Sequence, residues 1–154
     1  MWKDLVRTDT NHWKAAKKRA KGGQKVLVAS SMGGYPLGAL LESTLAVALT
    51  LRGAQVDVML CDGMLPACQL TEMQNVSPME LDQTEKQPRC ATCYPAGKSV
   101  FGPLGLPIHW LGKLLDHGQI EDAERIASDV PLDKISDYRL NGLAVGEHAL
   151  AGAL

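Results

Sequence analysis

The chain has 154 residues, a formal net charge of −1 and a sequence pI near 6.4. This length supports one folding unit with a real core and is too short for two full-sized domains. A near-neutral charge argues against a nucleic-acid-binding protein, which would carry a strongly basic domain. The sequence shows neither the apolar run of about 18 to 20 residues that a membrane-spanning helix needs nor a secretory signal core. We therefore expect a cytoplasmic protein.

The first 23 residues form a basic N-terminal arm. Seven basic residues against two acidic ones give it a formal charge of +5 and leave −6 in the remainder. Residues 10–20 favour a helix, which Gly22 and Gly23 would end. Such an arm could bind a partner or make peripheral contact with the inner face of a membrane. The alternative, which we favour for a short basic helix, is a solvated face with Trp2 and Trp13 packed on the domain.

Residues 25–63 have the pattern of a β-α-β unit. Lys25–Ala29 is a short apolar run rich in β-branched residues, as expected of a parallel strand buried on both faces. Apolar residues then recur at helical spacing from Pro36 to Leu51, and residues 56–60 alternate as a second strand. Two strands joined by a helix almost always form a right-handed parallel unit. The predicted fold class is therefore α/β, a Rossmann-like parallel sheet of few strands with flanking helices.

The remainder of the chain gives weaker signals. Residues 62–99 hold four prolines and three of the four cysteines, which predicts an irregular, cysteine-containing loop. A short third strand is expected within 105–110, followed by a helical turn, and an amphipathic helix over 119–128. Residues 141–154 favour an Ala/Gly/Leu-rich helix without a stop signal. The expected organisation is the arm over 1–23 and a Rossmann-like domain over 24–154, which could be the N-terminal part of a larger or two-chain enzyme.

A glycine turn follows the first strand directly and opens the helix. Ligands of open α/β sheets bind at this end of a strand, and free N–H groups at a helix start attract phosphate or carboxylate. The glycine spacing matches neither a dinucleotide fingerprint nor a P-loop. A β-α-β protein also needs a Gly/Ser turn here for purely structural reasons, so both roles stay open. The candidate ligand-binding residues are Ser31, Met32, Gly33, Gly34 and Tyr35, together with Asp62 after the second strand, which is either a ribose ligand or a simple turn aspartate.

The same residues resemble a known family. The Gly-Gly turn, the helix of small and apolar residues, Arg52-Gly53 and the strand of alternating valines resemble the opening of GT-B-type glycosyltransferases. The likeness is greatest to bacterial surface polysaccharide enzymes and to the transferase that adds N-acetylglucosamine to lipid I. The segment Leu60–Cys68 with a later Cys-x-x-Cys resembles a cysteine-bearing subgroup of polysaccharide biosynthesis proteins. Many family members have His after the Gly-Gly pair, where this chain has Tyr35.

This resemblance covers residues 25–110 and implies an acceptor-side domain of a glycosyltransferase. Such a domain binds a carbohydrate or lipid-linked acceptor, while the sugar nucleotide binds on a C-terminal donor domain. These 154 residues hold no donor domain. We therefore expect transfer only with a protein partner or a further domain.

The cysteines are Cys61, Cys68, Cys90 and Cys93. In a reducing compartment they are expected as thiols or metal ligands. A Cys-x-x-Cys pair joined by a second pair would suit zinc or an iron–sulfur cluster. Structural thiols, a local disulfide and a catalytic dithiol are the alternatives. The dithiol reading is disfavoured because Cys-x-x-Cys would normally open a helix, whereas a loop is predicted here.

One histidine is a weak candidate for a catalytic base. His109 follows the predicted third strand near the ligand-binding edge, although a core or surface histidine is the commoner case. The alternative to the glycosyltransferase hypothesis is a non-catalytic zinc or iron–sulfur module that partners a larger enzyme. A small nucleotide-binding oxidoreductase is a third, which the glycine spacing disfavours.

Overall fold

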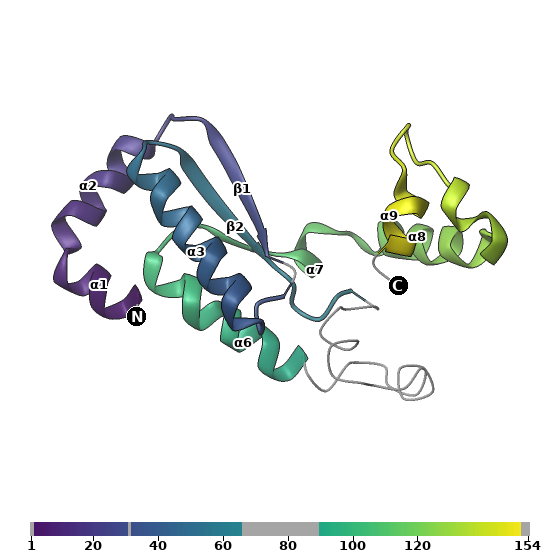
Figure 1. Cartoon of the computed structure of the whole chain (residues 1–154), viewed down its shortest axis with the longest axis horizontal. Coiled ribbons are helices and arrows are strands. Elements are labelled where there is room, and N and C mark those ends of the chain that lie inside the picture. Colours follow the sequence, from purple (N-terminus) through teal and green to yellow (C-terminus); the bar gives the residue numbers. More distant parts are fainter. Residues whose placement is uncertain (1, 31, 66–89, 152–154) are drawn as a thin grey trace. The chain divides into compact units, whose positions relative to one another are not determined.

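The computed structural model describes residues 2–30, 32–65 and 90–151 of the chain. It divides into two compact units, Met1–Leu114 and Leu115–Leu154 (Figure 1). The boundary falls inside the predicted 24–154 domain, and the basic arm belongs to the first unit. None of the described helices combines the length and the apolar character that crossing a bilayer requires.

The first unit is built on a three-stranded parallel sheet. Its strands are β1 (Lys25–Ser30), β2 (Gln55–Leu60) and β3 (Ile108–Trp110), in the order β1-β2-β3. β1 and β2 pair along their whole length, and β2 pairs with β3 through its last three residues. The α/β fold class is thereby confirmed, with β3 shorter than the predicted segment.

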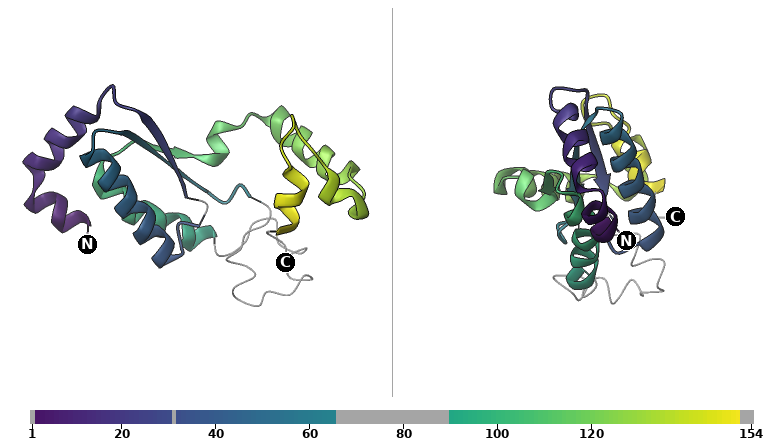
Figure 2. Two further views of the ribbon diagram at one scale, coloured as in Figure 1. Left: turned by 45° about the horizontal axis from the view of Figure 1, so that its top comes forward. Right: turned by 90° about the vertical axis from the view of Figure 1, so that its left-hand side faces the viewer.

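Two helices connect the strands and cover one face of the sheet. α3 (Pro36–Leu51) joins β1 to β2, and α6 (Cys90–Phe101) precedes β3. Both crossovers advance in the same direction across the sheet, and right-handed crossovers then place both helices on the same face. The two helices contact each other, as Figure 2 shows from two sides.

Burial along the strands alternates because successive side chains point to opposite faces. Val56, Val58 and Leu60 of β2 face the helices and are buried, whereas the residues between them are half-buried. The main core cluster gathers β2 side chains with Phe101 and Leu104, which are almost fully buried. Each such side chain contributes about 1.5–3 kcal/mol to folding.

The N-terminal arm forms two helices that pack on the first unit. They are α1 (Trp2–Thr8), which was not predicted, and α2 (Thr10–Ala20), which was. Trp13 is buried, and its indole N–H donates a hydrogen bond to the carbonyl of Leu104 at 2.7 Å. Trp2 donates to the Ser43 hydroxyl at 2.8 Å. The two tryptophans therefore attach the arm to the domain, as the alternative interpretation expected.

The prediction of an irregular segment over 62–99 is wrong for residues 90–99, which belong to α6. Pro95 lies within this helix and obscured its periodicity. Tyr94, Gly97 and Phe101 recur at helical spacing and face the rest of the unit, where Gly97 and Phe101 are buried. A short 3₁₀ turn, Gly102–Leu104, then leads toward β3, and α7 (Leu111–Leu114) follows it.

The second unit is a small helical assembly. It contains α8 (His117–Asp129), a 3₁₀ segment over Leu132–Asp137 and α9 (Val145–Ala151). The predicted helix over 119–128 is confirmed, and a capping box between Asp116 and Gln119 starts it. The helix predicted from residue 141 begins four residues later. Asn141 and Gly142 both have positive φ and form a tight turn between bridged residues, as Asn-Gly pairs favour.

Candidate functional site

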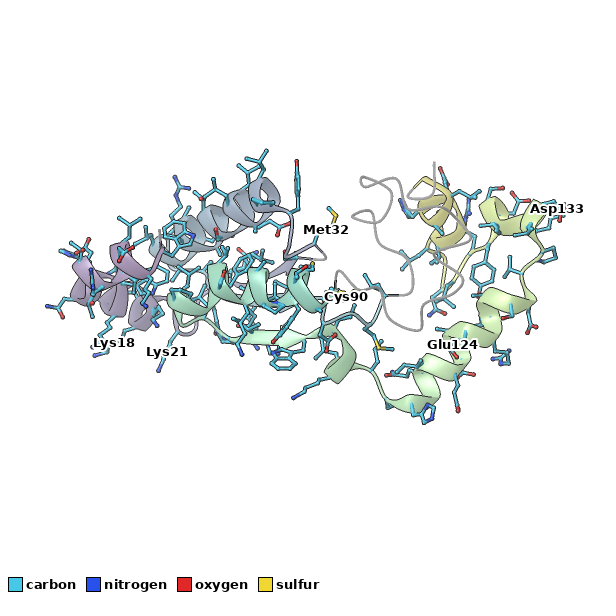
Figure 3. The ribbon with its side chains drawn as sticks, turned by 90° about the horizontal axis from the view of Figure 1, so that it is seen from below. Lys18, Lys21, Met32, Cys90, Glu124 and Asp133 are labelled. Atoms are coloured by element: carbon cyan, nitrogen blue, oxygen red, sulfur yellow. The ribbon has the colours of Figure 1, made fainter. Side chains whose placement is uncertain are left out.

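Three chain segments meet at the carboxyl edge of the sheet. The glycine turn follows β1, residues 61–63 follow β2, and residues 90–97 of α6 pack against both. Figure 3 shows Met32 and Cys90 at this same end of the unit. The edge is where open α/β sheets bind ligands. The predicted ligand turn and two of the predicted cysteines are therefore neighbours.

The glycines of the turn permit a close approach of α6. A Cβ on Gly33 would lie 2.9 Å from the Cα of Gly97, and one on Gly34 would lie 3.0 Å from the Cα of Cys93. The backbone N–H of Gly34 donates to Cys93 Sγ at 3.1 Å. Both glycines thus have a structural reason to lack a side chain. The reason could not be seen in the sequence, because Gly33 and Gly97 are far apart in it.

The other predicted turn residues occupy different positions. Met32 is half-buried, and its carbonyl accepts a hydrogen bond from the Tyr35 N–H at 3.0 Å. Tyr35 is the N-cap residue of α3, with extended backbone and no side-chain capping bond. Ser31 lies outside the described residues. The turn is therefore closed by its own backbone bond before the helix begins.

Asp62 is held by the segment that follows β3. Its carboxylate oxygen Oδ1 accepts a hydrogen bond from the Gly112 N–H at 3.0 Å, at the start of α7. The pKa of Tyr94 is raised mainly by burial and, to a smaller extent, by the negative charge of Asp62. Asp62 thus ties the β2 end to the β3 end of the sheet edge.

An aromatic and cationic patch lies at the end of β3 and was missed in the sequence. We define it as Tyr94, Lys98, Trp110 and Lys113. The rings of Tyr94 and Trp110 are 4.9 Å apart between centroids. The ammonium groups of Lys113 and Lys98 lie 4.4 and 5.8 Å from the centre of the indole ring. Each is within cation–π range, so two positive charges converge on one aromatic side chain.

Two buried hydroxyl groups in this region have no hydrogen-bond partner among the described residues. They belong to Ser30, the last residue of β1, and to Tyr94 in the patch. A buried polar group without a partner costs about 1–3 kcal/mol. The carboxyl edge of the sheet therefore contains unused hydrogen-bonding capacity.

The described cysteines, Cys61, Cys90 and Cys93, are partly exposed thiols. Cys90 and Cys93 both lie in helix α6, so the predicted loop placement is wrong for these two residues. Within the part of the chain that the structure describes, no three ligand-type side chains gather as a metal site requires. Cys68, the fourth predicted ligand, lies outside that part of the chain.

His109 lies within β3 and not after it. It pairs with Met59, which points away from the helix-covered face, so His109 occupies the other face of the sheet. Its Nε2 is 2.8 Å from Asp57 Oδ2. A cavity of about 260 Å³ beside this pair is lined by Lys25, Val26, Leu27, Gln55 and Asp57. The histidine is therefore on a different face from the helices that hold the glycine turn.

Comparisons with protein-family models, with curated proteins and with solved structures found no match to this chain. The functional argument therefore depends on the geometry of the sheet edge and on the chemistry of the side chains that it brings together.

Proposed function

We propose that this chain is the acceptor-side domain of a glycosyltransferase in surface polysaccharide biosynthesis. The observation that supports the proposal is the meeting of the glycine turn, Asp62 and the aromatic and cationic patch around the carboxyl edge of a parallel sheet. This edge is the ligand-binding position of open α/β sheets. The resemblance of residues 25–110 to GT-B-type acceptor domains agrees with it.

The patch suits an acceptor whose sugar is attached to a phosphate or diphosphate. Lys98 and Lys113 supply two positive charges beside the ring of Trp110. Lysine binds phosphate oxygens through charge-assisted hydrogen bonds, which are about twice as strong as neutral ones. The Tyr94 hydroxyl, for which no described residue is a hydrogen-bond partner, lies in the same patch. A lipid-linked saccharide phosphate satisfies both features.

Transfer needs a donor domain or partner chain that binds the sugar nucleotide. The general base is also expected there, because His109 lies on the face of the sheet away from α3 and α6. A lipid-linked acceptor would place the domain at the inner face of the membrane. The arm supports this placement, since Lys18 and Lys21 of the basic segment are exposed and can meet anionic lipid.

Calorimetric titration of the full chain with a soluble, short-chain prenyl-diphosphate saccharide tests the acceptor site. Replacing both patch lysines by alanine (Lys98→Ala, Lys113→Ala) should weaken binding about 10- to 100-fold, as the loss of charged hydrogen bonds predicts. Lys134→Ala, an exposed lysine of the second unit, is the matched control and should bind normally. Equal affinity of the double variant and the control would refute the assigned site.

A second candidate function is a non-catalytic zinc or iron–sulfur module that partners a larger enzyme. The observation that favours it is the spacing of Cys90 and Cys93 three residues apart in helix α6, with Cys90 against Gly63 in the segment that begins at Cys61. When bound, the metal would cross-link these segments. The described residues gather fewer than three ligands, so no step of the proposed function uses a metal.

Metal analysis and an absorption spectrum of protein purified without oxygen test this candidate. A stoichiometric metal that Cys90→Ser and Cys93→Ser each abolish would support the module. Visible sulfur-to-iron bands would identify a cluster, and a colourless zinc-loaded protein would identify zinc. A metal-free protein that still binds acceptor would eliminate it and leave the first function.

A further inference from the structure

Helix α3 buries small side chains and exposes five of its six leucines. The buried residues are Ala39, Ser43, Ala46 and Thr50. The exposed ones form one outward face and include Leu41 at 71% and Leu37 at 61% exposure; Leu40, Leu45 and Leu51 are also exposed. Single exposed leucines are ordinary, but a contiguous apolar face marks an interaction site.

The outward face has the spacing of a helix–helix seam. Leu37, Leu41, Thr44, Ala48 and Leu51 succeed one another at intervals of four and three residues in turn. This is the spacing of positions that interdigitate when two helices pack side by side. We call these five residues the α3 seam. Its occupant is therefore a helix.

We infer that the α3 seam is the two-fold interface between this chain and a second copy of itself, with the two α3 helices antiparallel. The inference does not depend on the proposed function. An isologous interface needs a self-complementary surface. Leu37 and Leu51 lie seven residues on either side of Thr44, so they meet each other across a two-fold axis at Thr44. Leu41 then lies level with Val47 of the other copy, beside the small Ala48.

The electrostatics of the seam agree with pairing between copies. Glu42 is the only charged residue of α3, and it lies off the seam, so no like charges meet. Antiparallel helices also bring opposite ends of their dipoles together. The Thr44 hydroxyl donates to the Leu40 carbonyl at 2.7 Å. Its burial at the axis therefore leaves no unpaired donor.

The area is sufficient for a weak but specific dimer. A helix of 16 residues is about 24 Å long. The three seam leucines and the flanking Leu40 and Leu45, at roughly half exposure on each copy, supply a total of at most on the order of 1,000 Å², the lower limit for a specific interface. A groove of about 130 Å³ between α1 and α3, lined in part by Trp2, Val47 and Leu51, lies where the other copy's Leu37 would arrive.

A lipid surface is the less suitable occupant. Lys18 and Lys21 of the basic arm lie on the side of α2 away from α3 in Figure 3. A membrane in contact with the seam would therefore miss these charges, although amphipathic membrane helices combine an apolar face with nearby cations. The seam and the basic arm serve different contacts.

Sedimentation equilibrium of the full chain across a concentration series tests the inference. Wild type should form dimers, and Leu41→Glu should weaken dimerisation at least about 100-fold, because it buries an unpaired charge. Leu132→Glu, at an exposed leucine of the second unit, should dimerise as wild type does. A monomeric wild type, or a dimer unaffected by Leu41→Glu, would overturn the inference.

Cysteine cross-linking tests the arrangement. Thr44→Cys places two sulfurs at the two-fold axis, within the Cα separation of about 4.4–6.8 Å that a disulfide needs. It should give covalent dimers under mild oxidation at a rate well above wild type. Glu42→Cys, off the seam, should match wild type. Equal cross-linking by the two variants, or self-cross-linking by Leu37→Cys instead of Thr44→Cys, would contradict an antiparallel pair.

Discussion

Replacing Gly97 by alanine tests the close approach between α6 and the glycine turn. The new Cβ would lie 2.9 Å from the Cα of Gly33 and 3.5 Å from its carbonyl carbon. Both are backbone atoms, which cannot rotate away. Overpacking of this kind costs about 1–3 kcal/mol, while alanine gains about 1 kcal/mol over glycine in helix propensity. The net expectation for Gly97→Ala is a loss of about 0–2 kcal/mol in the free energy of unfolding.

Gly102→Ala is the matched control, because a Cβ there meets nothing within 4 Å and its φ is not positive. It should be neutral or stabilising by about 0.4–1 kcal/mol. The free energy of unfolding, measured by urea unfolding followed by circular dichroism, should therefore be lower for Gly97→Ala than for Gly102→Ala. The wild-type value should lie between the two or equal one of them. For a unit of about 100 residues, each kcal/mol corresponds to about 4 °C or more in Tm. If Gly97→Ala proves as stable as Gly102→Ala, the packing argument is refuted.

Three further variants test the Tyr94 hydroxyl of the patch and the attachment of the arm. Tyr94→Phe removes a buried hydroxyl that has no partner among the described residues and should stabilise folding by up to about 1–3 kcal/mol; destabilisation would show that the hydroxyl is bonded. Burial raises the pKa of Tyr94, and the negative charge of Asp62 raises it further. The folded protein therefore disfavours the phenolate form of this side chain. The stability that the neutral Tyr94 side chain contributes is therefore complete below pH 10 and declines as the pH rises further. In an alkaline absorbance titration, the tyrosine that ionises at the highest pH should be absent from Tyr94→Phe. Trp13→Phe removes the buried indole hydrogen bond to the Leu104 carbonyl and leaves that oxygen only the longer bond from Lys17 Nζ at 3.4 Å, and it should cost about 1–3 kcal/mol. Trp2→Phe, at a less buried bond, should cost less, and the reverse order in chemical unfolding would mean that Trp13 does not anchor the arm.

The β-α-β unit could be predicted because its signals are local. The apolar run of β1, the helical spacing of α3 and the alternation of β2 each lie within a few neighbouring residues. Their parallel arrangement follows from the crossover helix between them, which returns the chain to the same end of the sheet. The capping box before α8 is another local signal that the structure confirms.

The missed features depend on contacts between distant residues. Tertiary packing of Phe101 makes α6 helical despite Pro95, and local propensity does not contain that information. The pairing of His109 with Asp57 joins residues that are 52 positions apart. The patch around Trp110 likewise combines α6 with the segment after β3. Sequence reasoning could thus bring the glycine turn and Asp62 to one edge of the sheet, but it could not name the aromatic and cationic patch beside them.

An NMR titration of the isotope-labelled full chain tests the central claim most directly. The two ligands are a soluble prenyl-diphosphate saccharide and a sugar nucleotide, added separately. The acceptor-domain account predicts saturable shifts from the prenyl-diphosphate saccharide at Gly34, Asp62, Trp110 and Lys113, with little response to the sugar nucleotide and no transfer when both are present. Saturable binding of the sugar nucleotide at this edge, or transfer by this chain alone, would contradict the account.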